Sequence, residues 1–498
     1  MDPLTNLFAN LITTMDILTI GFIGLFFLML GYKPPWWSKK QILSASSGCQ
    51  IPGPPSLPIL GTRWTFSWIG GYSLNKVHLF YRDMFRKYGP IIKEEALWNI
   101  PVISIVGRSD IEKVLKSSGK YPIRPPTEAI AYYRRSRPER YASTGLVNEQ
   151  GETWAHLRAN LTKDITSPHT ISTFLPQVDD MSKDLCSLIR HFRRDNDKIP
   201  QIELLTRRLG LEAMCTLVLG RRMGFLLPEG ETDIARRLRI AVHHHFLSCR
   251  DTYYGLPLWK LFHTPSYSHL IESEEGIYNL ALELVATADN ATKKSIIFDS
   301  ILNAEIDERE KTAAIVDFIA SGIHTLGNTL VFLLSLISKR KDVQEEIAND
   351  ENSEYVKACI KESFRLLPTA NCLARVIEKD LELSGHSLKA GSVVVCQTGL
   401  ACRDPNNFPN PDEFLPERWI GEEKAKTLAN STFLLLPFGC GKRQCPGRRF
   451  IEQSLPVILK ELVQNFIISY DKENIDISFE FIMAPMGPVQ MAFEDRSY

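Results

Sequence analysis

The sequence lacks any excess of charge of one sign. Over 498 residues, 58 lysines and arginines balance 58 aspartates and glutamates. A balanced chain presents no overall field to a polyanion, so we expect no nucleic-acid partner. Any charged partner must instead be recognised by a local patch.

Cysteine pairs of the CxxC type are also missing. Ten cysteines are scattered along the chain, and no CxxC pair occurs. This excludes the dense disulfide framework of a small secreted protein and favours free thiols in a reducing compartment. The chain also has no internal repeat and no low-complexity tract, which excludes a solenoid.

One long apolar run is present, near the N-terminus. Ile17 to Leu30 reads ILTIGFIGLFFLML and is followed by Lys33, Lys39 and Lys40. We interpret residues 1–35 as a membrane anchor or targeting segment, with the body of the protein on the side of the positive charges. Residues 36–50 are polar and predict a linker. The proline-rich stretch Ile51 to Thr62 predicts a stiff entry into a single domain that spans 51–498.

Within that domain the hydrophobic pattern is mainly helical. Strand-like segments are few and lie near 102–107, 393–397 and 475–493. The longest helix candidate, about 311–338, is apolar nearly all round and is therefore expected to be buried; at 1.5 Å per residue it would be on the order of 40 Å long. The sequence thus predicts a mainly α fold with small β-sheets and a long central helix.

Chemistry is concentrated in the segment Pro437 to Gly447, PFGCGKRQCPG. A haem-thiolate site needs a loop cysteine, glycines that permit turns, backbone N–H groups near the sulfur and a cation for the haem propionates. Here Cys445 would be the iron ligand, Arg443 the propionate donor and Phe438 a cover for the ring. A zinc site needs four ligands, and this segment offers two.

The segment resembles the haem-binding loop of the cytochrome P-450 family, whose other motifs follow in the family's order. The resemblance implies the P-450 fold with the long helix over haem b, and chemistry that uses O2 and electrons from NADPH through a redox partner. It places Glu362, Arg365 and Arg418 in a buried structural triad. It also implies that Trp154, Arg158 and Arg375 bind the haem propionates.

The central helix would supply the residues on the side of the haem where O2 binds. Where the family has a small residue, glycine, any residue, an acid and threonine, this sequence has Ser321, Gly322, Ile323, His324 and Thr325. We expect Gly322 to leave room for dioxygen and Thr325 to hydrogen-bond it and steer protons. His324 replaces the usual acid, and two interpretations stay open: a proton shuttle, or a core histidine held by a backbone carbonyl.

Three adjacent histidines, His243 to His245, invite a metal site. Adjacent residues on a helix point in different directions, so we predict a partly solvated helix face instead.

The sequence has features that resemble two different branches of the family. Lys357, Lys361, Arg448 and Arg449 predict a basic patch resembling the surface on which mitochondrial members receive electrons from a ferredoxin of adrenodoxin type. The anchor instead resembles the endoplasmic-reticulum type, which uses a microsomal reductase.

Within the mitochondrial branch, segments such as LPILGTRWTF and GIHTLGNTLVFLL resemble the insect ecdysone 20-monooxygenases. That resemblance implies hydroxylation of an apolar ecdysteroid, ecdysone, to 20-hydroxyecdysone. The pocket walls implied by the family layout are Tyr132 to Val147, Phe246 to Tyr254, Ala320 to Thr325 and Met483 to Val489. Alternatives are a monooxygenase of another steroid or xenobiotic, a haem-thiolate isomerase or dehydratase, and a non-catalytic haem or steroid binder.

Overall fold

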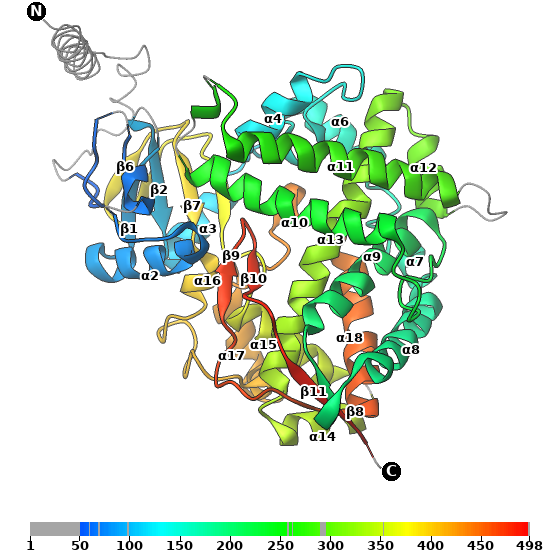
Figure 1. The fold of residues 1–498 in the computed structure, drawn as a ribbon. Coiled ribbons are helices and arrows are strands. Elements are labelled where there is room, and N and C mark those ends of the chain that lie inside the picture. Colours follow the sequence, from blue (N-terminus) through cyan, green and yellow to red (C-terminus); the bar gives the residue numbers. More distant parts are fainter. Residues whose placement is uncertain are drawn as a thin grey trace, which may run out of the picture.

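A computed structural model describes residues 50–58, 60–67, 70–96, 99–255, 258–260, 262–288, 295–351 and 353–496. The predicted anchor and nearly all of the predicted linker lie outside these residues. The described chain is predominantly helical with four small sheets, as the sequence predicted (Figure 1).

The helices, in chain order, have the following bounds. The first group is α2 (Val77–Tyr88), α3 (Arg108–Lys116), α4 (Glu128–Arg135), α5 (Gly145–Asn148), α6 (Gly151–Leu161), α7 (Pro168–Ser172), α8 (Leu175–Phe192), α9 (Ile202–Leu219) and α10 (Asp233–Tyr254). The second group is α11 (Pro265–Ala288), α12 (Ile296–Leu302), α13 (Glu308–Ile337), α14 (Lys341–Asn349), α15 (Glu354–Leu366), α16 (Thr398–Ala401), α17 (Lys424–Ser431) and α18 (Arg448–Asn465).

The strands are short. They are β1 (Ile91–Glu95), β2 (Pro101–Ile105), β3 (Lys198–Ile199), β4 (Leu373–Val376), β5 (Leu381–Leu383), β6 (His386–Leu388), β7 (Val393–Cys396), β8 (Phe466–Ser469), β9 (Ile477–Phe479), β10 (Met483–Pro485) and β11 (Met491–Asp495). The largest sheet has the order β1-β2-β7-β4, and in it β2 pairs parallel with β7, so that Val102 lies opposite Val393.

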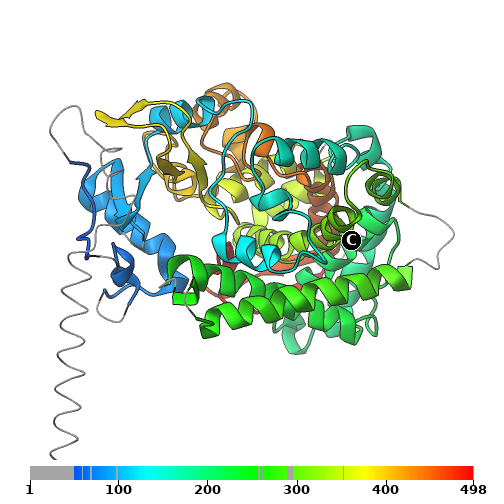
Figure 2. The same cartoon turned by 90° about the horizontal axis from the view of Figure 1, so that it is seen from above.

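The predicted central helix is α13, which crosses the core. It begins at Glu308, directly after Asp307, whose side chain accepts a hydrogen bond from the Arg309 N–H and caps the helix. Among the described residues α13 is the one helix long and apolar enough to span a membrane, but it is mostly buried inside the protein. It packs most extensively against α9, while α10 and α11 run side by side across one face of the molecule (Figures 1 and 2).

Glycine allows α13 and α9 to approach closely. A Cβ atom at Gly210 of α9 would lie 2.4 Å from the carbonyl oxygen of Ile323 on α13. Such a contact is too short for any side chain, so the backbones meet where Gly210 has none. This close packing fixes the middle of α13, where the predicted oxygen-side residues lie.

The body begins with the proline-rich stretch. The Lys93 N–H donates to the Pro52 carbonyl at 2.8 Å, and a Cβ at Gly53 would lie 2.0 Å from the Lys93 carbonyl oxygen. The stretch therefore lies directly against β1, in agreement with the predicted stiff entry.

Candidate active site

Cys445 lies in a tight loop before α18. Gly439 and Gly441 have φ angles of 71° and 64°, which side chains other than glycine rarely adopt. The Cys445 N–H donates to the Phe438 carbonyl at 2.8 Å and closes the loop. The turns that the sequence predicted at these glycines are therefore present.

The Cys445 sulfur is surrounded by donors. The backbone N–H groups of Gly447 and Arg448 point to it, and the Arg158 guanidinium lies near it. Burial raises the pKa of the Cys445 thiol against these opposing effects, although the residue is exposed. The sulfur is thus accessible, although the protein atoms around it weaken its hydration.

The second cysteine of the loop has a different setting. Cys440 is half-buried, and all nine described cysteines are free thiols. The Cys440 carbonyl accepts a long hydrogen bond of 3.5 Å from Arg375. The described residues thus give Cys440 no part in a disulfide with Cys445.

Four arginines converge beside the loop: Arg124, Arg158, Arg375 and Arg443. Burial, reinforced by Arg124, Arg375 and Arg158, lowers the pKa of Arg443 to about 10. Burial and Arg375 likewise lower the pKa of Arg124, which is accessible and desolvated like Cys445. So many cations at one place indicate a site for an anionic group.

Arg443 holds its place through several contacts but keeps one donor free. It donates to the Pro122 and Glu149 carbonyls at 2.9 and 2.8 Å, and its guanidinium lies 3.8 Å from the centre of the Trp154 ring. Its Nη1 atom is buried and has no partner among the described residues. An unpaired buried donor is costly, so Nη1 marks a place for an acceptor.

Arg124 was missed by the sequence interpretation. It lies in Ile123-Arg124-Pro125-Pro126, where the prolines impose an extended conformation but say nothing about where the side chain points. The sequence contained no signal for it beyond a basic residue in a non-helical segment.

The middle of α13 supplies hydroxyl groups. Ser321 is exposed and Thr325 half-buried, although the three residues between them are buried. The Thr325 Oγ1 donates to the Ser321 carbonyl at 3.0 Å. The hydroxyl remains able to accept one further hydrogen bond.

His324 is turned towards α10. It is 1% exposed, and its Nε2 lies 3.0 Å from the Arg239 carbonyl. Its ring stacks on His243 with the centroids 5.6 Å apart. Burial and Arg207 hold its pKa well below the ordinary value, so His324 is neutral. Of the two interpretations left open, these contacts are those of a core histidine held by a backbone carbonyl.

Gly322 also contacts a neighbouring helix. A Cβ atom there would lie 2.2 Å from the Met214 sulfur on α9. The missing side chain of Gly322 therefore makes room for Met214, and its part on the oxygen side stays a prediction.

The histidine run diverges as predicted. His243 contacts His324 and lies 3.4 Å from the Glu480 carboxylate. His245 lies 2.7 Å from Glu274 on α11. The imidazoles thus face different partners.

The predicted triad is confirmed. Arg365 and Arg418 donate to the Glu362 carboxylate at 2.8 and 3.0 Å, and Trp419 donates to it at 2.8 Å. Glu362 and Arg365 are fully buried. The network supports the Cys445 loop from behind, because Phe364 of the same helix contacts Phe438 with ring centroids 5.4 Å apart.

The predicted wall segments all reach α13. Arg134 of α4 binds Asp317 through two hydrogen bonds of 2.9 and 2.6 Å. Phe246 of α10 lies against His324, and Asn328 donates to the Met483 carbonyl of β10 at 3.4 Å. The structure therefore brings these three segments together around the helix that carries Thr325.

A family model for cytochrome P450 matches residues 51–493. The chain belongs to the cytochrome P450 family. It is a haem-dependent monooxygenase that uses O2 and receives electrons from a redox partner. The residues described above fit haem: Cys445 offers an accessible thiol beside backbone N–H donors, and the four arginines and the free Nη1 suit its two carboxylates.

Relatives of this P450 cover nearly its whole length. It is 42% identical over 481 residues to ecdysone 20-monooxygenase of Drosophila melanogaster, covering 90% of this chain and 89% of that protein. It is 30% identical over 477 residues to mitochondrial cytochrome P450 302a1 of the same species, covering 91% and 96%. It is 25% identical over 473 residues to mouse mitochondrial 1,25-dihydroxyvitamin D(3) 24-hydroxylase, covering 90% and 89%.

Proposed function

We propose that this P450 hydroxylates ecdysone at carbon 20 to give 20-hydroxyecdysone. The observation that carries the proposal is its 42% identity, over nearly the full length of both chains, to a protein named for that reaction. The three wall segments gathered around α13 support an enclosed site for an apolar steroid.

The proximal residues have proposed roles in holding haem. Cys445 would hold the haem iron through its thiolate, and the Gly447 and Arg448 N–H groups that point to its sulfur would stabilise the negative charge. Arg124, Arg158, Arg375 and Arg443 bind the propionates, while Trp154 holds the Arg443 guanidinium by stacking. Phe438 would pack against the ring. When bound, haem supplies the activation of O2 for insertion of one oxygen atom into a C–H bond.

The distal residues have proposed roles in proton delivery. The Thr325 hydroxyl, which donates to the Ser321 carbonyl, would also hydrogen-bond dioxygen or relay a proton to it. His324 is neutral and bonded to the Arg239 carbonyl, so we assign it to orienting α13 and not to carrying the proton. Gly322 lets α13 sit close enough to α9 to place Thr325.

We propose a ferredoxin of adrenodoxin type as electron donor and the mitochondrion as location. Lys357 and Lys361 on α15 and Arg448 and Arg449 on α18 are all exposed, and these two helices pack against each other. Mitochondrial P450s among the relatives support this donor. A microsomal reductase at the endoplasmic reticulum, suggested by the apolar N-terminal run, is the alternative.

The test is turnover by the purified haem-loaded protein with ecdysone and NADPH. One reaction contains a ferredoxin and its reductase, and the other contains the microsomal reductase. We expect 20-hydroxyecdysone by mass spectrometry, faster with the ferredoxin. A good carbon-monoxide spectrum with no oxygenated ecdysteroid from either donor would refute the substrate. Rearrangement of a peroxide substrate without NADPH would point to a haem-thiolate isomerase instead.

The ligand role of Cys445 has a separate test. Cys445→Ala should lose the absorption band that carbon monoxide gives with a reduced thiolate haem, while Cys440→Ala, the matched control in the same loop, should keep it. Retention of the band by Cys445→Ala would exclude Cys445 as the ligand.

Thr325→Ala should raise the NADPH consumed per product several-fold, because proton delivery is impaired.

A further inference from the structure

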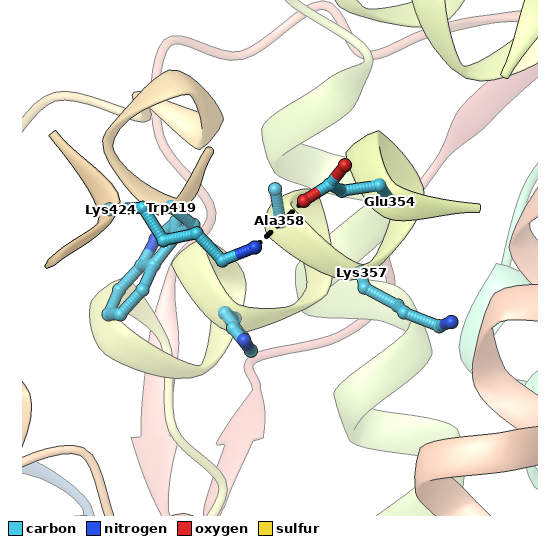
Figure 3. Close-up of a pocket in the computed structure, with 6 residues that line it drawn as sticks. Glu354, Lys357, Ala358, Trp419 and Lys424 are labelled. Atoms are coloured by element: carbon cyan, nitrogen blue, oxygen red, sulfur yellow. Dashed lines mark hydrogen bonds and ion pairs between the residues drawn. The ribbon is translucent and has the colours of Figure 1, made fainter. Parts of the chain in front are cut away.

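A surface pocket lies between α15 and the segment that leads into α17 (Figure 3). Its lining residues are Glu354, Lys357, Ala358, Lys361, Trp419 and Lys424. Three of them are lysines and one is an acid. Trp419 and Ala358 are each 2% exposed, so only their edges form the apolar floor.

The charges in the pocket are unequally partnered. Lys424 Nζ lies 2.8 Å from the Glu354 carboxylate, and Figure 3 shows this pair joined across the pocket. Within the described part of the chain, neither Lys357 nor Lys361 has an ion-pair partner. Glu354 is the single carboxylate among the lining residues, and it pairs with one of the three lysines.

The Glu354–Lys424 pair is weakly held. Its side chains are 62% and 44% exposed, and ion pairs so open to water contribute little to stability. Lys357 and Lys361 are one helical turn apart, where like charges repel. A carboxylate arriving from outside would relieve that repulsion and could replace Glu354 at Lys424.

The pocket also lies on the supporting side of the Cys445 loop. Its floor residue Trp419 donates to Glu362, the centre of the buried triad. Helix α15, which carries Lys357 and Lys361, also carries Phe364 against Phe438 of the loop. A protein seated here would contact the elements that hold the thiolate side of the haem site.

We propose that this pocket seats an acidic side chain of the electron-carrying partner, and that Glu354 is a built-in competitor for Lys424. The proposal rests on the ferredoxin proposed above and adds Lys424 to the docking surface. Docking breaks the Glu354–Lys424 pair, so Glu354 weakens binding and helps the oxidised ferredoxin to dissociate.

The experiment measures the affinity of the haem-loaded protein for an adrenodoxin-type ferredoxin by calorimetry at low ionic strength. Glu354→Gln should tighten binding about two- to five-fold and Lys424→Gln should weaken it by a similar factor, the range expected when one exposed ion pair is gained or lost. Asp233→Asn is the matched control, since it removes the acid of an exposed ion pair with Arg236 on α10. It should leave the affinity unchanged.

The double variant separates competition from a general charge effect. If Glu354 acts through Lys424, most of the gain from Glu354→Gln disappears in the Lys424→Gln background; additive effects would overturn the competitor role. Wild-type binding that Glu354→Gln leaves unchanged would overturn the inference alone. No binding of any variant would overturn both the inference and the ferredoxin, and tightening seen with the microsomal reductase instead would assign the pocket to that partner.

Discussion

Two histidines of α10 and α13 occupy opposite electrostatic settings. Burial and Arg207 hold the pKa of His324 well below its ordinary value. Burial also acts against the charged form of His245, but Cys249 and the Glu274 carboxylate outweigh it and hold the pKa of His245 well above that value. The neutral form of His324 is therefore favoured and so is the charged form of His245, because His324 faces a backbone carbonyl of α10 and His245 faces a carboxylate of α11.

The neutral His324 predicts an acid-labile contribution to stability. Between its lowered folded pKa and the unfolded value of about 6.5, the unfolded chain binds more protons, so stability is lost as pH falls below about 6.5. His324→Asn should make the free energy of unfolding less dependent on pH between about 6.5 and 4.5. Denaturant titrations at several pH values measure this slope.

The control for that slope is His156→Asn, because His156 is exposed. His245 contributes with the opposite sign: its stabilisation is complete below about 6.5 and is lost as pH rises through its raised folded pKa. It is unchanged in both variants. An unaltered slope in His324→Asn would contradict the neutral state of this histidine.

At the residue scale, the sequence predicted those features that depend on the spacing or the order of residues in a motif. The Cys445 loop, the helical pairing of Trp154 with Arg158, and the Glu362 triad follow from local geometry or from a motif order. The direction of His324 could not be predicted, since it depends on the Arg239 carbonyl of α10. Arg124 could not be predicted either, because its place depends on how distant segments meet.

At the scale of elements, the packing of α13 on α9 predicts unequal costs for two glycine substitutions. Gly210→Ala sets a Cβ against the backbone carbonyl of Ile323, which cannot move alone, and should cost about 1–3 kcal/mol of unfolding free energy. Gly322→Ala meets the flexible side chain of Met214 and should cost less.

Chemical denaturation of the two variants under the same conditions tests this order. An equal loss in both, or a greater loss in Gly322→Ala, would show that the backbones of α9 and α13 yield at least as readily as the Met214 side chain.

The long helix was predictable because its apolar residues extend over many turns, and α13 begins within three residues of the predicted start. Strands β2 and β7 were predictable as apolar runs of branched residues. Strands β1, β3, β4, β5, β6 and β8 were not predicted, since each is short and its pairing is set by partners elsewhere in the chain.

At the scale of the whole molecule, the contact of Pro52 and Gly53 with β1 marks the start of the folded body. We predict that a chain starting at residue 50 folds and binds haem, because these contacts are kept. We also predict that it no longer sediments with membranes, since the proposed anchor of residues 1–35 is removed. Carbon-monoxide spectra and flotation on vesicles measure the two outcomes.

A matched truncation to residue 60 is the control, because it removes the Pro52 and Gly53 contacts with β1. It should lose stability relative to the chain that starts at residue 50. Equal stability of the two would show that the proline-rich stretch is not part of the folded body.

The parallel pairing of β2 with β7 has a consequence for how the protein is made. Val102 and Val393 are partners although about three hundred positions separate them in the chain. A ribosome must therefore release most of the polypeptide before the largest sheet can close. Until then β1 and β2 can pair only with each other, and the edge of β2 that later binds β7 stays open to pairing with other strands.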